Sequence, residues 1–138
     1  MAEESRDGSA HVFRIEGARI DAIEDLYAQL NTLLMQEEDW ELGVSLDALN
    51  DVLYRFNRKN VVGPTVFVWA DHGHSREALG RAATARWLEE KLRHPDSFDV
   101  QTIRAQRDAL MSGEGKTYFE IVLEVFAEHA PDVRLELD

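Results

Sequence analysis

The feature that most restricts the fold is an alternation of short strand-like segments with longer helix-like ones. Strand-like composition occurs at 11–17, 65–69 and 133–137. Apolar residues recur at helical spacing in the intervening segments, which predicts helices at 19–36, 46–56, 75–94, 99–111 and 113–132. Strands separated by helices indicate a parallel sheet, so the sequence predicts an α/β fold in which a small three-stranded parallel β-sheet packs with α-helices.

Two serines stand where helices are expected to begin. Ser45 precedes the helix at 46–56, and Ser75 opens the helix at 75–94. A serine at this position accepts a hydrogen bond from a backbone N–H of the first turn. Both serines are therefore predicted to be N-caps.

The length of 138 residues suits one domain with a core of its own. Residues 1–10 lack periodicity and are predicted to be a disordered tail, which leaves 11–138 as a single domain. The N-terminus is polar and acidic rather than secretory, and no apolar run approaches the roughly 20 residues of a membrane helix. The chain contains no cysteine, which excludes disulfides and is compatible with a reducing compartment. We expect a cytoplasmic protein.

The charge is strongly negative and unevenly distributed. The net charge is −12, from 27 acidic and 15 basic residues. Nine acidic side chains and no basic one lie between Asp21 and Tyr54. A surface of this sign repels nucleic acid and anionic membranes and attracts basic proteins. We therefore expect a protein partner, and neither nucleic acid nor a membrane.

The helix predicted at 46–56 has one apolar and one acidic face. Its apolar positions are Leu46, Leu49, Leu53 and Phe56. Asp47 and Asp51 lie one turn apart on a nearly opposite face, where like charges destabilise an isolated helix by roughly 0.2–0.5 kcal/mol. A solvated helix face is the simplest interpretation, and a partner-binding face is the alternative.

Two further patterns favour the partner-binding interpretation. The predicted loop at 37–45 places Trp40 and Leu42 among four acidic residues, and tryptophan is enriched at the energetic centres of protein interfaces. The last predicted helix also carries an acidic line, formed by Glu120, Glu124 and Glu128.

Two short motifs suggest ligand binding only weakly. The segment "GEGKT" at 113–117 resembles the end of a phosphate-binding loop, but Leu110 occupies the position of the first glycine. Asp71, His72 and His74 follow the strand at 65–69, but a metal site needs three or four converging ligands. Solvated histidines at a helix start are the expected outcome.

Catalysis by the paired carboxylates is a further weak hypothesis. Asp47 and Asp51 could divide general-acid and general-base roles, but no histidine, nucleophile or cation lies near them in the sequence. We therefore expect no enzyme activity, no metal and no cofactor.

The segment "SLDALNDVL" at 45–53 resembles the acidic recognition helix of the barstar family, the intracellular protein inhibitors of barnase-type ribonucleases. The resemblance continues in order along the chain, in "IEGARIDAIEDLYAQL" at 15–30, "PTVFVW" at 64–69 and "VLEVFAEHAPDVRLEL" at 122–137. These blocks cover a little over half of the chain. The family implies a three-stranded parallel sheet with packed helices, and inhibition in which an acidic helix and loop block the basic active site of a guanyl-specific ribonuclease.

The resemblance also implies the residues that contact the partner. Asp51 corresponds to the principal acid that occupies the phosphate site, Asp47 to its neighbour on the same helix, and Glu128 to the acid of the final helix. Glu41 stands where the family has a loop aromatic, and Trp40 is a possible substitute one position earlier. The full predicted set is Trp40, Glu41, Leu42, Gly43, Val44, Ser45, Asp47, Asn50, Asp51, Phe56 and Glu128.

Glu41 is one departure from the family, and the sequence departs from it at other places as well. Asn50 and Phe56 each replace a tryptophan, and an insertion at about 70–116 has no counterpart in the family's prototype. The leading hypothesis is therefore a ribonuclease inhibitor of the antitoxin or immunity type. The alternative is a barstar-like protein-interaction module with a non-nuclease partner.

Overall fold

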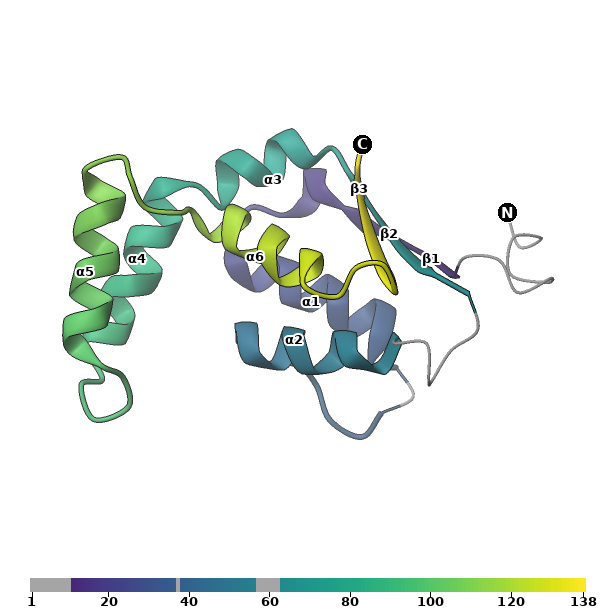
Figure 1. Cartoon of the computed structure of the whole chain (residues 1–138), viewed down its shortest axis with the longest axis horizontal. Helices are drawn as coiled ribbons and strands as arrows, with labels where there is room; N and C mark the ends of the chain where they lie inside the picture. Colours follow the sequence, from purple (N-terminus) through teal and green to yellow (C-terminus); the bar gives the residue numbers. More distant parts are fainter. Residues whose placement is uncertain (1–10, 37, 57–62) are drawn as a thin grey trace.

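The computed structural model describes residues 11–36, 38–56 and 63–138, so the tail predicted at 1–10 lies outside the described residues. Three parallel strands, β1 (His11–Glu16), β2 (Thr65–Ala70) and β3 (Val133–Leu137), form one sheet in the order β1-β2-β3 (Figure 1). The helices are α1 (Ile23–Leu34), α2 (Leu46–Leu53), α3 (His72–Ala78), α4 (Arg81–Leu92), α5 (Val100–Met111) and α6 (Tyr118–Ala127). The prediction of an α/β fold with a three-stranded parallel sheet is confirmed.

The central strand carries the core. In the sheet register His11 of β1 lies opposite Thr65 of β2, which lies opposite Val133 of β3. Alternate residues of β2 point to the same face, and this places Phe67 and Trp69 against the helices, where both side chains are fully buried. Burial on both sides of the strand explains why its sequence is nearly continuously apolar.

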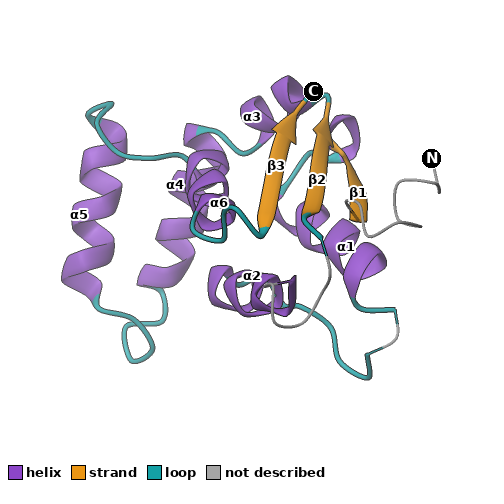
Figure 2. Cartoon of the chain, turned by 45° about the vertical axis from the view of Figure 1, so that its right-hand side comes forward, coloured by secondary structure: helices purple, strands orange, loops and turns teal. Residues whose placement is uncertain are grey.

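Aromatic rings and three helices fill the space behind the sheet. The ring of Phe67 lies 5.1 Å from those of Phe13 and Phe126, measured between centroids. Buried side chains of α1, α2 and α6 complete this core, which Figure 2 shows as helices covering one face of the sheet. The sheet and these helices therefore form the rigid body from which α2 presents its outer face.

The helix predicted at 75–94 is interrupted. The structure has two helices there, α3 and α4, separated at Leu79 and Gly80, because glycine is a poor helix former and the Leu79 carbonyl accepts a hydrogen bond from Phe119 N at 3.2 Å. The α3 helix also begins earlier than predicted, at His72.

The prediction that Ser75 is an N-cap is wrong. Ser75 lies inside α3 and is fully buried. Its Oγ accepts a hydrogen bond from Trp69 Nε1 at 2.9 Å and donates one to the Gly17 carbonyl at 2.9 Å. A buried indole N–H requires an acceptor, and Ser75 supplies it. The corresponding prediction for Ser45 is confirmed, since its side chain accepts from Ala48 N.

The segment predicted as an insertion has two parts. The α3 helix packs onto the main core, whereas α4 and α5 form a helical hairpin beside it (Figure 1). The hairpin has a small core of its own, made of Ala85, Leu88, Ile103 and Leu110. It is attached to α6 by Thr84, whose Oγ1 accepts from Tyr118 N at 2.7 Å, and by the Trp87 ring, which lies 4.8 Å from that of Tyr118. None of the helices in the described part of the chain is long and apolar enough to span a membrane.

Candidate protein-binding surface

The α2 helix holds two carboxylates in fixed positions. Ser45 caps its first turn by accepting from Ala48 N at 3.2 Å, and buried side chains on the opposite face, among them Leu49 and Leu53, anchor it in the core. Asp47 and Asp51 project from the outer face and are exposed. Among the described residues, neither carboxylate forms an ion pair or a side-chain hydrogen bond. The helix therefore presents two negative charges that no ion pair with a described residue neutralises, although Asp47 lies within electrostatic range of Lys91.

The C-terminal end of α6 lies beside this face of α2. The His129 Nε2 lies 2.7 Å from the Asn50 Oδ1, and the rings of Tyr54 and His129 meet edge to face at 4.7 Å between centroids. Glu128, the residue before His129, closes α6 and is exposed. The fold thus brings a third carboxylate to the same side of the molecule as Asp51.

A single asparagine fixes the loop that precedes α2. The Oδ1 of Asn31 on α1 accepts from Leu42 N at 2.6 Å, and its Nδ2 donates to the Leu42 carbonyl at 3.1 Å. The Leu42 side chain is buried at the same point. On either side of this anchor, Trp40 and Val44 are about half exposed, at 47% and 46%. The loop therefore presents two apolar side chains from a backbone that is held in place.

Arg55 holds the first half of the same loop. Its Nη2 donates to the Leu34 carbonyl at 3.3 Å and lies 3.8 Å from a carboxylate oxygen of Glu38. The guanidinium also lies over the Phe56 ring, 5.8 Å from its centroid. Because Arg55 is engaged in these internal contacts, it does not neutralise Asp47 or Asp51.

We define the acidic surface as the exposed residues of α2, the loop 38–45 and the end of α6. Seven of the predicted partner-binding residues are exposed on it: Trp40, Glu41, Gly43, Val44, Asp47, Asp51 and Glu128. Ser45 and Asn50 are half-buried. Leu42 and Phe56 are buried, at 5% and 9% exposure, so they support the surface from below and do not present side chains to a partner.

The burial of Phe56 follows from its neighbours. Its ring lies 5.7 Å from that of Phe13 and 6.1 Å from that of Phe67, so it completes the aromatic core beneath α2. His129 and Asn31 are the contributions that sequence reasoning missed. His129 contacts the side chain of Asn50, which lies 79 positions earlier, and nothing in the local sequence indicates this contact.

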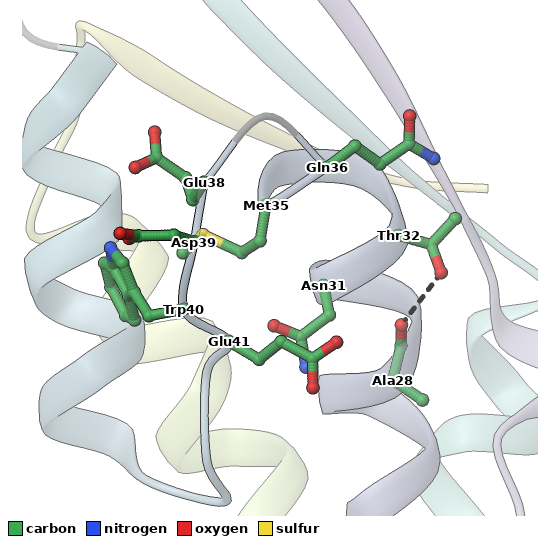
Figure 3. A pocket seen from close by; sticks show the side chains of 9 residues that line it. All are labelled: Ala28, Asn31, Thr32, Met35, Gln36, Glu38, Asp39, Trp40 and Glu41. Carbon is green, nitrogen blue, oxygen red and sulfur yellow. Dashed lines mark hydrogen bonds between the residues drawn. The ribbon is translucent and has the colours of Figure 1, made fainter.

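A hollow of about 690 Å³ lies between α1 and the loop. Figure 3 shows Asn31 and Thr32 on the helix side, and Asp39, Trp40 and Glu41 on the loop side. The hollow is open and adjoins the acidic surface, where Trp40 forms part of its rim. Its acidic lining suits a basic group of a partner better than an anionic substrate.

The weaker ligand-binding hypotheses gain no support. His72 and His74 are used in contacts between segments, with the Asp138 carbonyl at 3.0 Å and the Asp21 carboxylate at 2.7 Å respectively. Within the described ranges, no three histidine, aspartate or glutamate side chains gather as metal ligands. Lys116 of the glycine-rich segment is paired with Glu124, and the hollow that both residues line also contains the carboxylate of Glu114, which disfavours a phosphate.

Comparisons of the chain with protein-family models and with curated proteins give no match. The acidic surface is therefore the feature from which a function can be inferred. It is negatively charged, anchored in the core and bordered by the exposed apolar side chains of Trp40 and Val44.

Proposed function

We propose that this protein is a cytoplasmic inhibitor of a basic, guanyl-specific ribonuclease, acting as an antitoxin or immunity protein. The observation that carries the proposal is the pair Asp47 and Asp51, which are exposed on a helix anchored in the core and form no ion pair or side-chain hydrogen bond with a described residue. Glu128 stands on the neighbouring helix end. The resemblance to the barstar family supports the same interpretation of these three residues.

The chemistry of a ribonuclease explains why such a surface would inhibit it. A nuclease active site gathers basic side chains around the scissile phosphate. A carboxylate held on a rigid helix can occupy that site in place of the phosphate. Because α2 is already ordered by Ser45 and by its buried face, little conformational entropy is lost on binding. The opposed charges also accelerate encounter and discriminate against wrong partners.

Each part of the acidic surface has a role in this proposal. Asp51 enters the phosphate site and contributes most, Asp47 and Glu128 pair with basic groups around it, and the exposed ring of Trp40 supplies an aromatic contact at the edge. The loop is held by Asn31 before any partner arrives.

Co-expression tests the proposal. Ribonuclease toxins encoded beside this gene are expressed in a sensitive host with the unchanged protein, with Asp51→Ala or with Glu77→Ala. Glu77 is exposed on α3, so its variant removes one negative charge far from α2 (Figure 1). Rescue of growth by the unchanged protein and by Glu77→Ala, with loss of rescue by Asp51→Ala, is the expected result. Failure to rescue growth from any of the toxins would instead favour a barstar-like interaction module with a non-nuclease partner.

A further inference from the structure

A second concave feature lies where the α4–α5 hairpin meets the acidic surface. It is a groove of about 600 Å³ between the hairpin, the start of α1 and the loop before α2. Its apolar lining includes Ile23 of α1, Val44 of the loop, and Ala83, Trp87 and Phe98 of the hairpin segment. Figures 1 and 2 both place the α4–α5 loop, which carries Phe98, beside the N-terminal end of α2.

Lys91 connects this groove with the acidic helix. Its ammonium group lies over the Trp87 ring, 4.1 Å from the centroid, and 5.1 Å from the centroid of Phe98. Burial lowers the pKa of Lys91, and the carboxylate of Asp47 acts in the opposite direction. The lysine therefore packs on the aromatic lining of the groove and is within electrostatic range of the first carboxylate of α2. The two features form one continuous surface.

Val44 belongs to both the acidic surface and the groove, and this shared position indicates which partner reaches the groove. It is a predicted partner-binding residue of the loop and also lines the groove. Because Val44 lies one residue before the N-cap of α2, a protein that contacts both Asp47 and the loop also reaches the groove. The occupant is therefore the same partner that binds the acidic surface.

The charge of the inserted segment indicates which type of side chain of the partner enters the groove. Residues 70–116 contain eight basic and eight acidic residues, so the whole net charge of −12 lies outside them. The insertion as a whole offers no net attraction to a basic partner, in contrast to α2, and its charged residues at the groove are Arg86, Glu90 and Lys91, with His94 beside them. Trp87 and Phe98 offer apolar area instead, and Phe98 is 39% exposed. Interfaces commonly gain much of their affinity from an aromatic or aliphatic anchor that fills such a groove.

We propose that the groove receives one aromatic or large aliphatic side chain of the same basic ribonuclease, so that the insertion forms the second half of the binding surface. This inference rests on the proposed function and identifies the chemistry of the partner more narrowly. The basic active site faces α2, and an apolar residue adjacent to it on the ribonuclease enters the groove.

The test uses the full-length protein and the ribonuclease whose toxicity it suppresses. Dissociation constants are measured for the unchanged protein and for Phe98→Ser, Phe98→Leu and Met111→Ser. Met111 is an exposed apolar residue at the end of α5 that does not line the groove, so it is the matched control. Thermal unfolding and circular dichroism establish that each variant is folded.

Phe98→Ser is expected to weaken binding about ten- to thirtyfold through faster dissociation, as removal of an interface anchor does. The dissociation constants of Phe98→Leu and Met111→Ser should stay within about threefold of that of the unchanged protein. If Asp51→Ala weakens binding but Phe98→Ser does not, the groove proposal is wrong and the proposed function stands. If no tested ribonuclease binds the unchanged protein, both proposals are wrong.

Discussion

Asn31 anchors the centre of the loop before α2 at Leu42, and Asn31→Ala should loosen the loop at that point. Asn31 makes two hydrogen bonds with the backbone of Leu42, at 2.6 Å and 3.1 Å. Each intramolecular hydrogen bond contributes about 0.5–1.5 kcal/mol net, so the variant should lose about 1–3 kcal/mol of unfolding free energy. The loss should fall toward the lower value if the freed backbone groups reach water.

The assay combines two measurements on the isolated protein. Urea denaturation gives the change in unfolding free energy, and amide hydrogen exchange reports the protection of Leu42 N–H directly. Thr32→Ala is the matched control, because Thr32 lies next to Asn31 on α1 and its exposed hydroxyl donates to the Ala28 carbonyl of its own helix. Exchange at Leu42 should accelerate at least tenfold in Asn31→Ala and stay unchanged in Thr32→Ala.

Binding should respond to the same change. A loop that must be ordered on association reduces affinity by the cost of ordering it. Asn31→Ala should therefore bind the ribonuclease more weakly although it removes no residue of the acidic surface. Equal protection of Leu42 in Asn31→Ala and the unchanged protein would refute the reasoning, because the loop would then be held by other contacts.

Two other predictions concern stability. Gly17→Ala should destabilise the fold by about 2–3 kcal/mol in urea denaturation, because its Cβ would lie 2.2 Å from the Ala70 carbonyl oxygen, whereas Gly43→Ala meets nothing within 4 Å and should change stability by less than about 0.5 kcal/mol. Equal changes in unfolding free energy for Gly17→Ala and Gly43→Ala would contradict this steric explanation. Burial raises the pKa of Tyr27 to about 12 and that of Tyr118 further, against an ordinary value near 10, so the folded state keeps both phenols neutral. Unfolding free energy should therefore be fully retained below about pH 10 and fall between pH 10 and 12, by up to about 1.4 kcal/mol per pH unit for each group, and the Tyr27→Phe variant should show a shallower fall. An identical slope in the variant would exclude the tyrosine pair as the cause.

The local patterns of the sequence were sufficient for the sheet and most helices. The strand at 65–69 could be predicted because burial on both faces selects an unbroken apolar run, and α2 because Leu46, Leu49 and Leu53 recur at helical spacing. The interruption at Gly80 was missed, since the apolar spacing on either side of it is compatible with one continuous helix. The role of Ser75 was missed as well, because it depends on Trp69, which belongs to a different element.

The candidate surface could be predicted only in part, because some of its residues are held by contacts with other elements of the fold. The exposure of Asp47 and Asp51 follows from helical periodicity within α2 alone. The contacts that hold the surface together are long-range, such as His129 with Asn50, and periodicity carries no information about them. The burial of Phe56 likewise depends on Phe13 of β1 and Phe67 of β2, which belong to other elements.

The proposed function is tested most directly by comparing inhibition by Asp51→Ala and Glu77→Ala, which remove the same charge from different places. Asp51→Ala should raise the inhibition constant at least about thirtyfold, equivalent to about 2 kcal/mol, while its unfolding free energy stays equal or rises by roughly 0.2–0.5 kcal/mol as repulsion with Asp47 is relieved. The inhibition constant of Glu77→Ala should stay within about threefold of that of the unchanged protein. Association with the ribonuclease should slow as salt increases for the unchanged protein and for both variants. Equal inhibition by the two variants would contradict the assignment of Asp51 to the ribonuclease active site.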